Sequence, residues 1–333
     1  MKALITGGAG FIGSTVASAC LDAGITPVIL DSLVTGRREF TEGRAFYEGD
    51  IADGELVDQV FADHPDIAAT IHCAALIVVP ESVSAPLHYY RENVAKTVAL
   101  VEHLQRNGCE RLLFSSSASI YRPGEDFSVD ETSELDPLSP YARTKMLTEL
   151  IFKDTAEASS LRVLSLRYFN PIGADPALRT GLQTPVPSHA LGKLVQARRA
   201  DTPFLLTGTD WPTRDGSGIR DYVHVWDLAR AHVAALDRFD VVLPPDSAGS
   251  YEVLNLGTGR GTTVRELVAA FEAVTGDRMS TEEAPRRPGD NAGAFSRTAK
   301  AEQLLDWRAE LSLEQGIADT LAWFERREAV LGA

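Results

Sequence analysis

The chain has 333 residues, a formal net charge of −15 at pH 7 and 44% hydrophobic residues. This length allows one large or two medium domains with a sizeable core. The negative charge argues against a polyanion such as DNA or RNA as partner.

The three cysteines, Cys20, Cys73 and Cys109, have no metal or redox spacing. We therefore expect bland, mostly buried thiols and no metal site. The chain opens directly into an apolar strand pattern, which leaves no room for a signal peptide, and no apolar run approaches a membrane span. These features predict a reduced, cytosolic protein without a membrane partner.

Short apolar runs alternate with helical patterns through the first half of the chain, which is typical of βαβ units around a parallel sheet. The predicted strands are Ala3–Thr6, Pro27–Leu30, Ala45–Tyr47, Ala69–His72, Arg111–Ser115 and Arg162–Arg167. The predicted helices between them are Ile12–Ala23, Gly54–His64, Pro86–Asn107 and Tyr141–Ala158. The pattern predicts an α/β fold with a Rossmann-type, doubly wound parallel sheet.

The character of the sequence changes after Asn170, where proline, glycine and charged residues become more frequent. Thr263–Glu266 is a capping box that predicts a helix ending at Gly276, and a last amphipathic helix is expected from Leu313 to Arg326. We expect residues 1–170 to form a nucleotide-binding domain to which segments around 220–260 return. Residues 171–333 are expected to form mainly a smaller α+β domain.

The glycine-rich run Thr6–Gly13 lies between the first strand and the first helix. Glycines in this setting permit a tight turn and close approach of a pyrophosphate to the helix N-terminus. Asp31 ends the second strand, where a carboxylate binds the adenosine ribose and repels a 2′-phosphate. The pattern favours NAD over NADP, although Arg37 and Arg38 are alternative partners for such a phosphate. Asp50-Ile51 either contacts the adenine or forms a surface turn.

Tyr141 and Lys145 are four residues apart and share a helix face. An ammonium near a phenol favours the phenolate and lowers its pKa from about 10 toward neutrality. Such a phenolate is a good general base for a sugar hydroxyl. The spacing alone also fits two residues of an exposed helix, so the chemistry depends on the surrounding motifs.

Together these motifs resemble the extended short-chain dehydrogenase/reductase superfamily and, within it, the UDP-glucose (UDP-galactose) 4-epimerases. The similarity runs over nearly the whole chain. Ser115–Tyr121 is similar to the epimerases' active-site strand and loop. The related sugar-nucleotide 4,6-dehydratases have an Asp-Glu pair near the place of Ala118-Ser119, which counts against dehydration here. Arg220–Val225 and Ala284–Asp290 are similar to segments that bind a nucleoside diphosphate.

The resemblance implies Ser117, Tyr141 and Lys145 as catalytic residues. Tyr141 would take the proton of the hexose 4-hydroxyl while the C4 hydride passes to the nicotinamide, and Ser117 would bind the reacting oxygen. Lys145 would also bind the nicotinamide ribose. The 4-keto sugar then turns over and takes the hydride back on its other face. This implies NAD, a UDP-hexose of the glucose, N-acetylhexosamine or uronic acid series, and a homodimer formed through Pro86–Asn107 and Tyr141–Ala158.

The remaining expected contacts also follow from the resemblance. Expected cofactor contacts are Gly7, Gly10, Phe11, Ile12, Gly13, Asp31, Ser32, Asp50, Ile51, Cys73, Ala74, Ala75, Asn93, Ser115, Tyr141, Lys145, Tyr168 and Phe169. Expected substrate contacts are Ser117, Tyr141, Asn170, Arg220, Tyr222, Arg287 and Asp290. The two arginines would pair with phosphate oxygens and Asp290 with a ribose.

Several residues depart from the family pattern. Arg122 stands where many members have glycine, and Thr184 falls near a usual asparagine. Ala294 is small at a position where side-chain size gates N-acetylated sugars, and Ile77-Val78 leave the sugar-side wall apolar.

Two alternative functions remain open. One is another NAD-dependent nucleotide-sugar enzyme of the superfamily, such as a reductase or decarboxylase. The other is a non-catalytic dinucleotide sensor, which needs no Tyr-Lys pair beside a serine strand. We expect His72 and His224 to be loop or core residues rather than ligands, the tryptophans to be packing residues, and Glu125–Glu134 to be a solvated loop.

Overall fold

The computed structural model describes residues 1–184, 187, 189–245, 250–286 and 291–332. Seven strands form its main sheet in the order β12-β7-β5-β4-β1-β2-β3, and every pairing is parallel. These strands are β1 (Lys2–Thr6), β2 (Thr26–Asp31), β3 (Ala45–Glu48), β4 (Ile67–His72), β5 (Arg111–Ser115), β7 (Arg162–Tyr168) and β12 (Tyr251–Leu256). The strand order reverses between β1 and β4, and ligands of doubly wound sheets bind at such a switch point.

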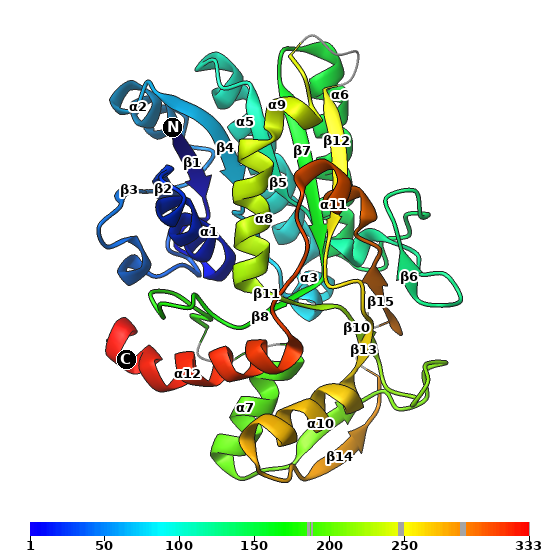
Figure 1. Ribbon diagram of the computed structural model, residues 1–333. Coiled ribbons are helices and arrows are strands. Elements are labelled where there is room, and N and C mark those ends of the chain that lie inside the picture. Colours follow the sequence, from blue (N-terminus) through cyan, green and yellow to red (C-terminus); the bar gives the residue numbers. More distant parts are fainter. Residues whose placement is uncertain (185–186, 188, 246–249, 287–290, 333) are drawn as a thin grey trace.

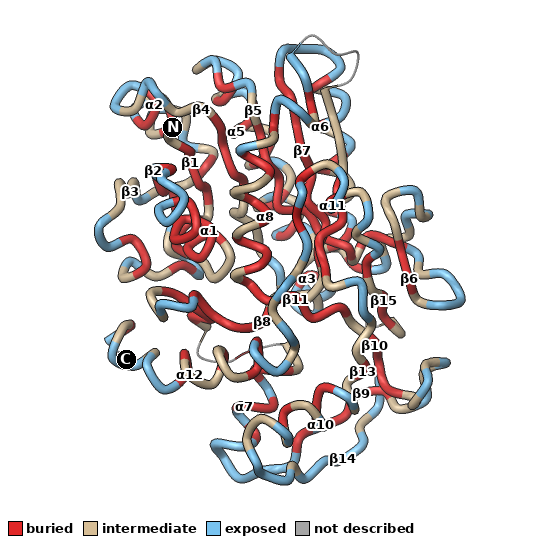
Figure 2. Tube along the Cα trace, in the orientation of Figure 1, coloured by how far each residue is buried: buried red, intermediate tan, exposed pale blue. Residues whose placement is uncertain are grey.

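Helices cover both faces of this sheet (Figure 1). On one face lie α1 (Phe11–Asp22) and α8 (Val225–Asp237), and on the other α2 (Gly54–Asp63), α5 (Lys96–Arg106) and α6 (Pro140–Ala158). Successive strand residues point to opposite faces: Ile5 packs in the core with Val16 and Leu228, whereas Leu4 packs in the core with Leu104 and Phe152. Figure 2 shows the buried chain concentrated in these strands.

The smaller lobe, at the bottom of Figure 1, has its own core around α7 (Ala190–Ala200), α10 (Val264–Thr275) and α12 (Leu313–Leu331). Outside the main sheet, the described strands form short sheets in the orders β13-β10-β15-β6, β11-β8 and β14-β9. Their strands are β6 (Ser128–Val129), β8 (Asn170–Ile172), β9 (Phe204–Thr207), β10 (Ile219–Arg220), β11 (Tyr222–His224), β13 (Thr262–Thr263), β14 (Thr281–Ala284) and β15 (Gly293–Ser296). The other helical segments are η1 (Arg38–Thr41), α3 (Val79–Ser84), α4 (Pro86–Tyr90), η2 (Arg91–Ala95), η3 (Ala118–Ile120), α9 (Phe239–Val242) and α11 (Ala299–Leu305).

All six predicted strands and the predicted helices form, with ends shifted by a few residues at most places. The segment Pro86–Asn107 is interrupted by a π-helical turn, η2, and the last helix continues to Leu331. The capping box is present, and Gly276 ends α10 in the left-handed conformation with φ 74°. Among the described residues, no helix combines the length and the apolar character needed to cross a membrane.

The prediction of a solvated acidic loop at Glu125–Glu134 is wrong at its centre. Ser128 and Val129 are buried and form β6, which pairs with β15. The carboxylate of Glu131 accepts a hydrogen bond from the backbone of Asn255. Acidic composition did not reveal this docking because the partners lie more than a hundred residues away in the chain.

Candidate functional site

A cradle of backbone atoms forms where β1 passes into α1. Gly7 has φ 70°, and a Cβ there would lie 2.6 Å from the amide nitrogen of Ala74. A Cβ at Gly13 would lie 2.3 Å from the carbonyl oxygen of Gly7. The α1 helix begins at Phe11, and its N-cap residue Gly10 gives no side-chain hydrogen bond to the first-turn amides. This arrangement fits a dinucleotide pyrophosphate, which binds to backbone amides at a helix N-terminus.

Asp31 lies beside this cradle at the end of β2. Its carboxylate accepts hydrogen bonds from the amides of Ala9 at 2.9 Å and Leu33 at 2.8 Å. Burial raises its pKa, and the two hydrogen bonds counteract that rise. Arg38, which the sequence offered as an alternative partner for a 2′-phosphate, forms an ion pair with Glu48.

Further along the sheet edge, Asp50 forms an ion pair with Lys96 at 2.5 Å. The next residue, Ile51, is buried. The exposed Ser32 follows Asp31 directly. The carboxyl ends of β1, β2 and β3 therefore bring the expected cofactor residues to one edge of the sheet.

Ser117, Tyr141 and Lys145 converge at the carboxyl end of β5. The α6 helix begins there because Ser139 caps it by accepting from the amide of Ala142, and Pro140 stands in its first turn. The Lys145 ammonium donates to the carbonyl oxygen of Ser115 at 2.7 Å. Ser117 hydrogen-bonds to Tyr141, and its hydroxyl lies 2.9 Å from that of Ser119.

Burial changes the pKa values of both Tyr141 and Lys145. It raises the pKa of Tyr141, and the hydrogen bond with Ser117 counteracts this in part. It lowers the pKa of Lys145 to about 8, against the raising effects of Cys73 and Glu149. The prediction that Lys145 brings the Tyr141 pKa toward neutrality is wrong in this structure. The reason is geometric, since the ammonium donates to the Ser115 carbonyl while desolvation dominates the phenol.

Polar groups behind this site form a hydrogen-bonded chain. The Cys73 thiol lies 3.1 Å from the Ser115 hydroxyl, which lies 3.3 Å from Nε2 of His232. Burial raises the pKa of Cys73 to about 11, which agrees with the expected bland thiol. Tyr168 and Phe169 follow at the end of β7, and burial also raises the pKa of Tyr168.

Asn93 holds the loop after β4. Its amide accepts from the backbone nitrogen of Leu76 and donates to the Leu76 carbonyl and the Thr144 hydroxyl. Both amide hydrogens are thereby used within the protein, so the structure gives Asn93 a positioning role on the loop that contains Ala74 and Ala75. The next loop residue, Ile77, is 61% exposed.

Three of the expected substrate residues, Asn170, Arg220 and Tyr222, lie on the short strands β8, β10 and β11. The strand register pairs Tyr222 with Asn170, and Arg220 with Ala294. The Arg220 guanidinium donates to the carbonyl oxygens of Ile219 and Ala292 at 2.7 and 3.1 Å. Arg287 and Asp290 lie outside the described residues.

Ala294, the small residue at the expected sugar-size position, is buried against Ala118 and Tyr121 of the active-site loop. Arg122 is tied by ion pairs to Glu134 and Asp136, which gives that loop its own anchor. Thr184 is half-buried.

The histidines behave as expected. His72 is buried between the hydroxyls of Thr6 and Thr97, and burial lowers its pKa to about 3. His224 caps α8 and contacts Asp319. Among the described residues no cluster of His, Cys, Asp or Glu fits a metal ion.

Trp307 and Trp323 are buried, whereas Trp211 stacks under the Arg286 guanidinium at 3.6 Å.

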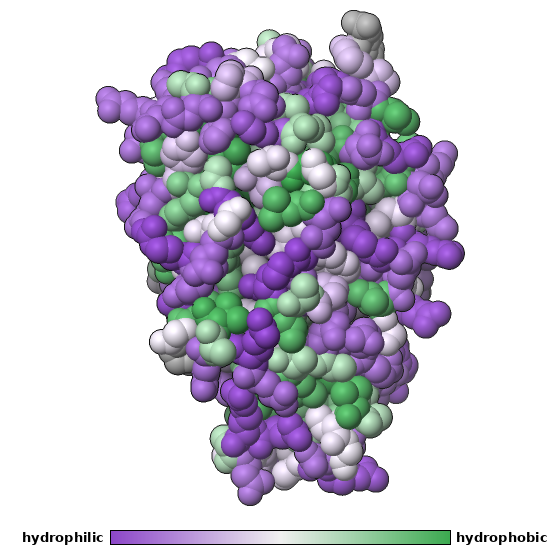
Figure 3. Space-filling view, turned by 60° about the vertical axis from the view of Figure 1, so that its left-hand side comes forward, coloured by the Kyte–Doolittle hydropathy of each residue, from purple (hydrophilic) through white to green (hydrophobic). Residues whose placement is uncertain are grey.

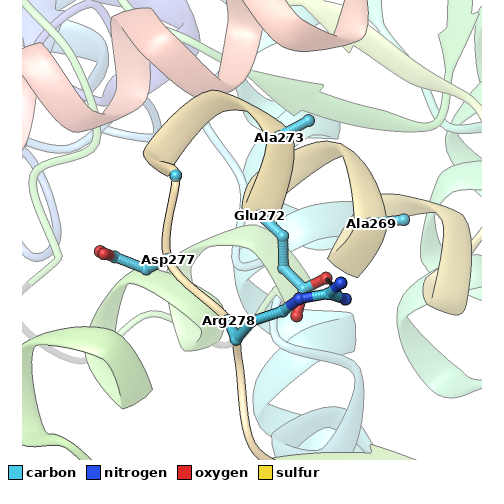
Figure 4. Close-up of a pocket in the computed structure, with 6 residues that line it drawn as sticks. Ala269, Glu272, Ala273, Asp277 and Arg278 are labelled. Carbon is cyan, nitrogen blue, oxygen red and sulfur yellow. Dashed lines mark hydrogen bonds and ion pairs between the residues drawn. The ribbon is translucent and has the colours of Figure 1, made fainter.

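Two open pockets lie in the smaller lobe. One of about 400 Å³, lined by residues that include Thr209 and Arg286, lies where β9 and β14 end. The other, of about 300 Å³, lies at the C-terminal end of α10, where Glu272 and Arg278 form an ion pair (Figure 4). The second pocket is far from α6 in Figure 1 and brings together none of the expected site residues.

The backbone cradle at the switch point and the Ser-Tyr-Lys group at the end of β5 define a member of the extended short-chain dehydrogenase/reductase superfamily. Residues 3–257 match the NAD dependent epimerase/dehydratase family, and the chain belongs to this family.

Known relatives cover nearly the whole chain. The UDP-glucose 4-epimerase of Azospirillum brasilense is 41% identical over 334 residues, covering 99% of this chain and 94% of that protein. The structure of UDP-glucose-4-epimerase from Stenotrophomonas maltophila, with bound NAD and formylated UDP-arabinopyranose, has a TM-score of 0.92 and 37% identity over 99% of both chains. The Bifidobacterium longum UDP-glucose 4-epimerase, in complex with NAD+ and UDP, gives a TM-score of 0.90 and 32% identity over 98% of both chains.

Proposed function

We propose that this protein is an isomerase, an NAD-dependent UDP-hexose 4-epimerase that interconverts UDP-glucose and UDP-galactose. The observation that carries the proposal is the convergence of Ser117, Tyr141 and Lys145 at the carboxyl end of β5, beside the backbone cradle at Gly7–Gly13. Full-length similarity to UDP-glucose 4-epimerases supports it.

The NAD site lies in the domain of the first 170 residues and comprises the cradle, Asp31 and the nearby strand ends. The later segments β12 and α8 complete this domain. Asp31 recognises the adenosine ribose, and Lys145 the nicotinamide ribose. When bound there, NAD would supply the hydride acceptor for C4 of the hexose and the donor that gives the hydride back. The negative carboxylate of Asp31 opposes the 2′-phosphate of NADP.

The chain's own residues manage the proton. Tyr141 removes it from the 4-hydroxyl and returns it to the same oxygen after the sugar has turned over. Ser117 hydrogen-bonds the reacting oxygen and supports the negative charge on Tyr141, since its hydrogen bond lowers the Tyr141 pKa. Lys145, protonated below about pH 8, supplies positive charge on the same helix face.

The remaining residues, mainly 171–333, hold the UDP group while the sugar stays loosely bound. Asn170, Arg220, Tyr222, Arg287 and Asp290 are the proposed anchors, with the arginines on the diphosphate. The small side chain of Ala294 against the active-site loop favours admission of N-acetylhexosamines as well, so UDP-GlcNAc is the second substrate to test.

We propose a cytoplasmic homodimer formed through α4–α5 and α6. Leu87 and Leu150 on these helices are 77% and 49% exposed, and α4 packs on α6. The face of the molecule in Figure 3 shows apolar patches separated by polar side chains. Two neighbouring helices with exposed leucines are better suited to a self-complementary interface.

The test is to purify the protein without adding cofactor, assay retained NAD, and follow UDP-glucose, UDP-GlcNAc and UDP-glucuronate by NMR. Epimerisation without consumption of NAD supports the proposal. A requirement for stoichiometric fresh cofactor would indicate a reductase, and loss of carbon dioxide a decarboxylase. Retained NAD without turnover of any sugar would indicate a sensor.

A further inference from the structure

A buried ion pair lies directly behind the active-site strand. The guanidinium of Arg167 on β7 binds both oxygens of the Glu149 carboxylate on α6, with Nε 2.9 Å from Oε1. Their side chains are only 6% and 5% exposed. The Ser116 hydroxyl donates to the same carboxylate. Arg167 of β7 and Ser116, which follows β5, thus both bind the Glu149 carboxylate of α6.

The pair extends to the active-site loop. Arg167 donates from Nη1 to the hydroxyl of Tyr121 at 2.7 Å, and its guanidinium lies 4.8 Å from the centre of that ring. The Tyr121 hydroxyl in turn donates to Asn255 on β12 at 2.7 Å. The far end of the loop Ala118–Tyr121 is therefore fixed by the same network that fixes Ser116 at its near end.

We propose that Glu149 and Arg167 are positioning residues that set the placement of Ser117 relative to Tyr141 and Lys145. Glu149 lies one helical turn after Lys145 and two turns after Tyr141, on the same face of α6. It also binds Ser116, the neighbour of Ser117. The inference rests on the proposed epimerase function.

Stability alone explains this pair poorly. Replacing a buried ion pair by well-packed apolar residues is often neutral or stabilising, because desolvation costs as much as the attraction gains. A planar guanidinium on a carboxylate fixes distance and angle, however. The pair ties α6, which carries Tyr141 and Lys145, to the segment after β5 that carries Ser117, and small displacements between such groups are costly to the rate.

The carboxylate also acts on Lys145. The groups that face this ammonium are His72 and Cys73 from the end of β4, and Glu149 from its own helix. Cys73 is a neutral thiol at pH 7, and His72 is neutral because burial lowers its pKa. Glu149 is thus the anionic group among these three, and it favours the protonated ammonium.

The experiment compares Glu149→Gln, Arg167→Met and the double variant Glu149→Leu/Arg167→Met. Each single variant leaves a buried group without its partner, so the double variant guards against simple misfolding. We expect all variants that fold to retain NAD, and the double variant to lose about 10- to 100-fold in kcat with a small change in KM. Glu149→Gln should also move the alkaline limb of the kcat profile to lower pH. Arg167→Lys should recover part of the rate.

Arg162→Met is the matched control. Arg162 also lies on β7, is nearly as buried, and pairs with Asp240 at the opposite end of the strand. It should change stability and leave kcat within about threefold of the parent. If the double variant folds and keeps the parent kcat and pH profile, the pair only packs and the inference is overturned.

A readout independent of turnover separates this inference from the proposed function. The Lys145 side chain can be titrated by NMR with isotope-labelled lysine, assigned through Lys145→Arg. Glu149→Gln should lower its pKa, and Ser116→Ala should leave it near that of the parent. An unchanged Lys145 pKa in Glu149→Gln overturns the inference even if the parent proves inactive, whereas parent inactivity alone refutes only the epimerase function.

Discussion

At the level of single residues, burial drives the two central titratable groups toward their neutral forms. It raises the pKa of Tyr141 and lowers that of Lys145 to about 8. A phenol of this kind needs a hydrogen-bond donor and nearby positive charge to give up its proton. Ser117 supplies the first. The Lys145 ammonium donates to the Ser115 carbonyl and does not lower the Tyr141 pKa in this structure.

Tyr141→Phe removes the proton-transfer group while it preserves the ring. We expect retained NAD and a loss of at least about a hundredfold in kcat, which is typical for loss of acid-base catalysis. Steady-state kinetics with UDP-glucose measures this. Tyr47→Phe, which removes an exposed hydroxyl bound to Asp63, is the control and should leave the rate unchanged. Near-full activity of Tyr141→Phe would remove Tyr141 from the mechanism.

The rate should fall on the alkaline side as Lys145 loses its proton. With a pKa of about 8 the ammonium is mostly charged at pH 7 and mostly neutral at pH 9, so we expect about a tenfold decrease in kcat over this range. Because the folded pKa lies below the ordinary value of 10.5, stability from this group rises with pH between those values. Lys145→Arg stays charged, and any activity it retains should lack this alkaline limb. A flat parent profile from pH 7 to 9 would contradict the assignment.

At the level of elements, the long periodic segments and the glycine-rich turn could be predicted from the sequence because their signals are local. The strands that join the lobes could not. They contain two to four residues, and Tyr222 pairs with Asn170 while Phe295 pairs with Ser128. The Glu149–Arg167 network could not be predicted either, because it depends on how α6 packs against β7. Its one sequence signal is that Glu149 continues the Tyr141–Lys145 face of α6.

Substitutions in the glycine-rich turn should separate folding from cofactor binding. A Cβ at Gly10 would meet the Gly7 carbonyl oxygen at 3.4 Å, an ordinary contact, whereas a Cβ at Gly13 would meet it at 2.3 Å. Gly10→Ala should therefore fold but bind NAD at least about tenfold more weakly, because the methyl group fills the pyrophosphate approach. Gly13→Ala should lower the thermal midpoint as well. Calorimetric titration and thermal unfolding measure the two effects, and unchanged NAD affinity in Gly10→Ala would place the pyrophosphate elsewhere.

At the scale of the whole molecule, the two lobes carry different groups of the expected site residues. Ser117 follows β5 of the parallel sheet, and Tyr141 and Lys145 lie on α6. The short strand β15 pairs with β10 and packs Ala294 against Ala118 and Tyr121. Asp221 helps to join these strands, since its buried carboxylate accepts from Thr258 and Ser296. Burial raises the pKa of this carboxyl to about 6.

The proposed dimer gives a prediction at the same scale. Leu150→Lys introduces a charge into the exposed surface of α6 and should convert the dimer to a monomer at micromolar concentration. Leu205→Lys on β9 alters a leucine that is 55% exposed in the smaller lobe and should leave the dimer intact. Sedimentation velocity measures both. A parent protein that sediments as a monomer, or a Leu150→Lys dimer, would rule out this interface.

In the proposed reaction, the hydride that leaves C4 of the hexose returns to C4 within a single turnover. The most direct measurement uses UDP-glucose deuterated at C4, incubated with catalytic amounts of the protein and followed by NMR and mass spectrometry. We expect UDP-galactose that keeps the deuterium at C4, with no net change in NAD. Deuterium lost to solvent, or a product formed only as NAD is consumed, would contradict it.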